Sequence, residues 1–111
     1  MNLAPRVSLA LAFCVYAGAS PAQTHDVAPE VWDRPRTANA ILGQESIQRS
    51  MAVLLAQPEA RLVIHHAPAQ EPELQAEELR SWLGALAIDP RRIALRGDLA
   101  AGTPIRMEVI P

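Results

Sequence analysis

From residue 44 onward, helix-type and strand-type segments alternate along the chain, and this alternation limits the folds open to it. Apolar residues recur at helical spacing over residues 44–57 and 73–87. Strand-type patterns cover residues 60–66, 92–96 and 105–109, with prolines or glycines between the segments. Helices that alternate with strands predict a layered α/β domain.

The expected order is β-α-β-α-β-β, and its first and weakest strand lies at Ala38–Leu42. Right-handed crossovers would pack both helices on one face of the sheet. We expect residues 23–43 to form an extended arm that leads into this strand, and residues 44–111 to form the domain. The helix stripes expected to face the core are Ile47, Met51, Leu54 and Leu55 in the first helix, and Ala76, Leu79, Leu83 and Leu86 in the second.

The first 22 residues have the pattern of a secretory signal peptide. Arg6 precedes the apolar run 7–17, and the small residues 18–22 follow. The run is shorter than the roughly 20 apolar residues that a membrane-spanning helix needs. Cleavage after Ala22 is favoured over cleavage after Ala19, and the alternative is an uncleaved anchor. The prediction is a periplasmic or secreted protein.

Composition narrows the function classes further. Cys14, the only cysteine, lies inside the predicted signal, so the exported chain would have no disulfide and no thiolate site. All ten basic residues are arginine, which is typical of a GC-rich, bacterial coding sequence. Without Arg6 there remain nine arginines against twelve acidic residues, a net charge of −3. That balance gives no general attraction for nucleic acid or anionic lipid.

Between residues 75 and 97, an aromatic-leucine pair on a helix precedes an arginine-isoleucine pair that leads into a strand, with a glycine after it. The residues of this pattern are Trp82, Leu83, Ile88, Arg92, Ile93 and Gly97. The pattern resembles the C-terminal domain of outer-membrane protein A and the peptidoglycan-associated lipoproteins, and the resemblance reaches from about Ile47 to Val109. It implies an OmpA-like α/β fold and a site for peptidoglycan.

The site that the resemblance implies is altered in this chain. In the family, an aspartate after the strand histidine and an arginine near the second helix hold the diaminopimelate head group. Here His66 falls on the histidine, but Pro68 replaces the aspartate and Gln75 replaces the arginine. The loop at 67–72 is also shorter. We therefore expect no standard diaminopimelate binding, and we keep His66, Gln75 and Glu71 as ligand-binding candidates.

A second candidate surface precedes the predicted first strand. Trp32, Arg34 and Arg36 lie in a proline-containing segment, and tryptophan and arginine are enriched among interface hot spots. We therefore assign these three residues as partner-binding candidates. The alternative is that Trp32 folds back over a sheet edge or the helix layer.

Catalytic and metal sites are not expected. His65 and His66 are adjacent on a strand, so their side chains point to opposite faces and do not chelate one ion. A third ligand would have to be His25 or an acid such as Glu71. The serines after residue 22 fall on predicted helices, without a sharp-turn motif. We expect no cofactor.

The predicted function is a non-catalytic partner-binding or scaffold module of the cell envelope. One alternative is a cell-wall binder with a rearranged pocket around His66. A small hydrolase or metal carrier is a third class. The sequence names no partner.

Overall fold

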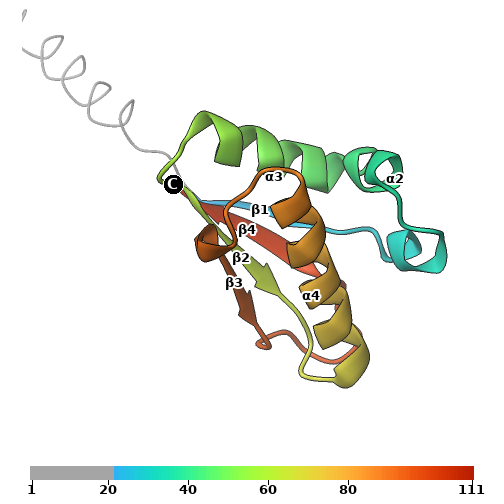
Figure 1. Ribbon diagram of the computed structural model, residues 1–111. Helices are drawn as coiled ribbons and strands as arrows, with labels where there is room; N and C mark the ends of the chain where they lie inside the picture. The colour runs from blue at the N-terminus through green and yellow to red at the C-terminus, as the bar shows by residue number, and fades with distance from the viewer. Residues whose placement is uncertain (1–21) are drawn as a thin grey trace, which may run out of the picture.

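The computed structural model describes residues 22–111, so the predicted signal peptide lies outside the described residues except for Ala22. A four-stranded mixed sheet packs against helices, which confirms the α/β fold class (Figure 1). The strands are β1 (Gln23–Asp26), β2 (Arg61–His65), β3 (Ile93–Arg96) and β4 (Arg106–Ile110). The helices are α2 (Ala38–Leu42), α3 (Glu45–Ala56) and α4 (Gln70–Ala85), with short 3-10 turns η1 (Pro29–Asp33) and η2 (Pro90–Arg92).

The strand order is β1-β4-β2-β3. The neighbouring strands β2 and β3 run parallel, and α4 supplies the long crossover connection that parallel neighbours need. The last strand, β4, is antiparallel to both of its neighbours, β1 and β2. Along the chain the strands and α-helices follow the order β-α-α-β-α-β-β, which is the predicted order β-α-β-α-β-β with the short helix α2 added.

The predicted position of the first strand is wrong. Residues Ala38–Leu42 form the short helix α2, whose start is capped by the Thr37 hydroxyl accepting a hydrogen bond from the Ala40 amide at 3.1 Å. The first strand is instead β1, at Gln23–Asp26. The expected arm at 23–43 is therefore also wrong, since its first residues belong to the sheet of the domain. The sequence of β1 shows no alternating apolar pattern, because β1 is an edge strand whose residues are polar and mostly exposed.

Both long helices are confirmed, with two local differences. On α3, Leu55 is 59% exposed, and Ser50 takes its place in the buried stripe. The Ser50 hydroxyl donates to the Ser46 carbonyl at 2.9 Å, so its burial leaves no unpaired polar group. On α4, the helix begins at Gln70 rather than Glu73. Pro72 fits within the first turn because that amide has no partner inside the helix.

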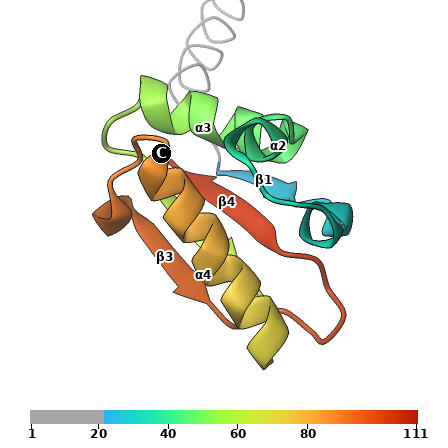
Figure 2. The ribbon, with the colours of Figure 1, turned by 45° about the vertical axis from the view of Figure 1, so that its right-hand side comes forward.

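The core lies between one face of the sheet and the two helices. Leu62 and Ile64 on β2 stand opposite Val109 and Met107 on β4, and all four are fully buried. They form one cluster with the buried side chains of α3 and α4, so both helices cover the same face of the sheet, as predicted (Figure 2). Within residues 22–111, no helix has the length and apolar character needed to cross a membrane.

We predict that Leu83→Ala strongly destabilises the domain. Leu83 is fully buried on α4, and its truncation removes apolar contacts and leaves a cavity. Such changes lower the free energy of unfolding by about 2–5 kcal/mol, which denaturant titration would measure. Leu55→Ala is the matched control, because the same change at an exposed helical site should leave stability within about 0.5 kcal/mol. Equal effects of the two variants would contradict the helix faces described above.

Candidate functional site

A groove runs between α4 and the segment that contains η1. Its first hollow has a volume of about 450 Å³ and its second about 300 Å³. Both hollows are lined by Trp32, Asp33, Glu71 and Gln75. We call the pair of hollows the η1–α4 groove; the first is completed by Arg36, Gln70, Leu74 and Glu78, and the second by Pro29, Pro72 and residues 102–105.

The two walls of the groove are joined by a bidentate ion pair. The Arg36 guanidinium donates to the two carboxylate oxygens of Glu78, from Nε at 2.6 Å and from Nη2 at 3.0 Å. The same carboxylate accepts a hydrogen bond from the Trp82 indole at 3.2 Å. The hydrogen bond from Arg36 holds the pKa of Glu78 below its usual value. A guanidinium that donates two parallel hydrogen bonds to a carboxylate fixes the relative orientation of the two groups as well as their distance.

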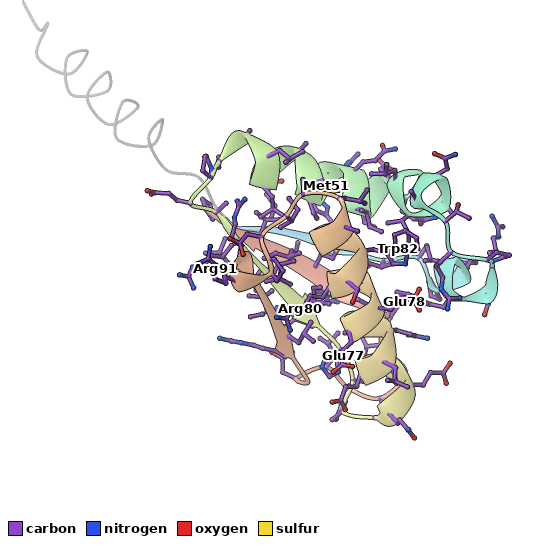
Figure 3. All side chains as sticks on the ribbon, in the orientation of Figure 1. Met51, Glu77, Glu78, Arg80, Trp82 and Arg91 are labelled. Carbon is purple, nitrogen blue, oxygen red and sulfur yellow. The ribbon has the colours of Figure 1, made fainter. Side chains whose placement is uncertain are left out.

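The aromatic residue of the groove is half-buried. Trp32 packs against the core cluster, and the Arg36 guanidinium lies 5.8 Å from the centre of its ring. Arg36 also donates to the Trp32 carbonyl at 3.0 Å, which holds the η1 segment in a defined conformation. Figure 3 shows Glu78 and Trp82 on the side of α4 that faces this segment, whereas Arg80 lies toward β3.

Strand pairing brings the η1 segment to α4. After β1, the amide of Val27 continues the sheet contacts by donating to the Ile105 carbonyl at 2.8 Å. Pro29 then starts η1, and Val31 buries its side chain in the core. Trp32 and Asp33 follow directly, beside the loop at 102–105 that lines the second hollow.

The groove brings together four of the six residues that the sequence singled out in two separate sets. Trp32 and Arg36 come from the partner-binding set, and Glu71 and Gln75 come from the ligand-binding set. The remaining partner-binding candidate, Arg34, lines a different hollow beside α2.

In the first hollow, four lining residues were not among the candidates that the sequence offered. No local pattern marks them, because each belongs to the site only through the packing of η1 against α4. They are Asp33, Gln70, Leu74 and Glu78.

His66 lies outside the groove and serves the packing of the strand end. It is 7% exposed, and its Nδ1 lies 2.8 Å from the Ala67 carbonyl, so this nitrogen carries the proton and donates. A side-chain carbon at Gly97 would lie 3.2 Å from the imidazole Cε1, so glycine there allows the ring to pack closely. Both backbone groups of His66 are also paired, with Arg96 and Leu99.

A polar cluster lies on the opposite, open face of the sheet. His65 contacts Asp98 through Nδ1 at 2.8 Å and Glu108 through Nε2 at 2.9 Å. Its neighbours across the sheet are Arg106 on β4 and Arg96 on β3. Partial burial alone would lower the pKa of His65, but the hydrogen bonds to Glu108 and Asp98 outweigh it and raise the pKa above 6.5. With a carboxylate on each ring nitrogen, the His65 ring has no nitrogen free for a metal or a substrate.

The residues considered for metal binding are not brought together. His25 stands opposite Met107 on the core face of the sheet, whereas His65 lies on the open face. Among residues 22–111, no group of three or more metal-ligating side chains is placed to hold an ion.

A larger hollow of about 710 Å³ lies at the start of α3, but the charges that line it are already paired. Arg49 contacts Glu45, and the Arg106 Nε donates to Asp26 at 2.8 Å. This hollow therefore offers less unpaired charge for binding than the η1–α4 groove does.

Comparison of this chain with protein-family models, with curated proteins and with solved structures finds no match.

We predict that His65 stabilises the fold in a pH-dependent way. Because its pKa is raised in the folded state, its contribution is fully present below its unfolded pKa near 6.5. That contribution is lost as pH rises through the folded-state pKa. The difference in unfolding free energy between the native chain and His65→Gln should therefore shrink as pH increases above 6.5.

Asp98→Asn provides the partial variant for this measurement, since it keeps the contact with Glu108. Its stability should fall less steeply across the same pH range. The pKa of Asp98 is lowered by its hydrogen bond to His65, so the carboxylate's own contribution is lost at acid pH, as pH falls through that pKa. A difference between native chain and His65→Gln that grew above pH 6.5 would contradict this account.

Proposed function

We propose that this chain is a non-catalytic partner-binding module of the bacterial cell envelope and that the η1–α4 groove is its contact surface. The observation that carries the proposal is the joining of Trp32 and Arg36 to Glu71 and Gln75 in one groove. Tryptophan and arginine contribute most strongly to binding when they are held in place within a partly desolvated surface. The ion pair between Arg36 and Glu78 supplies that support.

A non-catalytic role is supported by the state of the reactive side chains. A general base needs a nitrogen or oxygen that can reach a substrate proton. Both His65 nitrogens contact carboxylates, and His66 is buried with Nδ1 engaged by the Ala67 carbonyl. Ser46, Ser50 and Ser81 lie on α3 and α4, and among the described residues none of them makes a hydrogen bond to a histidine, although Ser46 and His25 line the same hollow.

The envelope assignment rests on the predicted signal peptide. Cleavage after Ala22 would leave β1 whole, because that strand begins at Gln23. Cleavage after Ala19 would add three residues before the strand.

We expect the exported protein to begin at Gln23. Intact-mass measurement on a periplasmic fraction of an expressing bacterium distinguishes this start from a start at Ser20. A leader retained in the membrane fraction would contradict both the export assignment and the envelope role.

The proposed function predicts that a partner protein occupies the η1–α4 groove in cells. A photo-reactive phenylalanine analogue in place of Leu74, which is 56% exposed and lines the groove, should give discrete cross-linked products in the producing bacterium. The same analogue in place of Leu55 is the matched control, because Leu55 is 59% exposed on α3 and does not line the groove. Gel shift and mass spectrometry would read out both.

A second arm of the experiment addresses the cell-wall alternative. Purified chain mixed with diaminopimelate-type peptidoglycan should stay in the supernatant after centrifugation, because Pro68 and Gln75 supply neither charge for the zwitterionic head group. Equal cross-linking from positions 74 and 55, together with sedimentation on peptidoglycan, would overturn the proposal in favour of a cell-wall binder.

A further inference from the structure

We propose that the occupant of the η1–α4 groove is a cationic polypeptide segment, in which arginine or lysine side chains alternate with apolar ones. This inference rests on the proposed function and names the chemistry of the partner. It is carried by the charge and the apolar surfaces that line the groove.

The charges of the groove leave an excess of carboxylate. Asp33, Glu71 and Glu78 face one guanidinium, Arg36, so the lining has a net charge of −2. Arg36 forms its ion pair with Glu78. The carboxylates of Asp33 and Glu71 have no ion-pair partner among the described residues. These two line both hollows, so a chain crossing from one hollow to the other would pass them.

The apolar surfaces of the groove fit the remainder of such a segment. Leu74 is 56% exposed in the first hollow, and Trp32 lines both. The second hollow has Pro29, Pro72 and Pro104 in its walls. Prolines have no amide N–H, so a partner that covers them leaves no donor unpaired. The Trp32 ring can pack against the aliphatic part of an arginine or lysine side chain.

An anionic occupant is disfavoured by the same residues. Its charge would meet Asp33 and Glu71, and the one guanidinium available is already held by both oxygens of Glu78. Charge complementarity of this kind selects partners mainly by excluding those of the wrong sign.

The test is titration of the exported chain with three end-blocked octapeptides, in which alanine alternates with arginine, glutamine or glutamate. The indole N–H signals in the NMR spectrum report the site, since Trp32 and Trp82 are the only tryptophans. We expect the arginine peptide to shift the Trp32 signal and to bind at least about tenfold more tightly than the glutamine peptide. Added salt should weaken the binding of the arginine peptide.

Two variants of equal charge change make the measurement specific. Asp33→Asn combined with Glu71→Gln should weaken the arginine peptide by about three- to tenfold, the range expected for two exposed charge contacts. Glu59→Gln combined with Glu77→Gln also removes two exposed carboxylates, but neither residue lines the groove. This control should bind like the native chain, and both variants should keep the native melting temperature.

Four results would overturn the inference. Equal weakening by both double variants would show only a general attraction to a negatively charged protein. Tighter binding of the glutamate peptide would show that the groove prefers a negatively charged partner. Self-association that is lost in Asp33→Asn/Glu71→Gln would assign the groove to a second copy. Cross-linking from position 74 without arginine-peptide binding would leave the proposed function standing and reject only the cationic partner.

Discussion

The pairing of β4 with two strands at once is the constraint on which the rest of this structure depends. β4 is the last element of the chain, yet it lies between β1, which starts the described residues, and β2, which comes from the middle. Its inward residues Met107 and Val109 meet Ile64 and Leu62 of β2, and this fully buried row is the floor on which α3 and α4 pack. Without that row, neither helix would have a surface on which to bury its stripe.

The same pairing creates two sheet faces of opposite character. Strand side chains alternate, so residues that flank the buried row point to the other side. They form the open face, where His65 lies between Asp98 and Glu108, and where Arg106 pairs with Asp26. These contacts join β1, β2, β4 and the loop after β3, so the charged face holds together the strands that the core covers on the other side.

The groove is a further consequence of where β1 ends. Because β1 pairs along β4, the chain leaves the sheet at Val27 and must turn beside the loop that precedes β4. Val31 is buried there, and Trp32 and Arg36 are thereby set against α4. Glu71 and Gln75 of α4 thus share a groove with Trp32 and Arg36 of the N-terminal segment.

By itself, the sequence determined the α/β class, the order of the elements from α3 to β4, both long helices and three of the four strands. These features follow from local periodicity: Ile47, Met51 and Leu54 can share a surface only on a helix, and Met107 and Val109 only on a strand. It also separated the two faces of β2, because alternation places His65 away from Leu62 and Ile64.

Only the tertiary structure decided where the first strand lies and which residues form the site. Gln23–Asp26 is polar and becomes a strand through its hydrogen-bonding partner β4, whereas Ala38–Leu42 is apolar enough for a strand but is capped as a helix by Thr37. The ion pair between Arg36 and Glu78 joins residues 42 positions apart. No local pattern specifies such a contact, because its geometry is set by how β1 and α4 are positioned on the sheet.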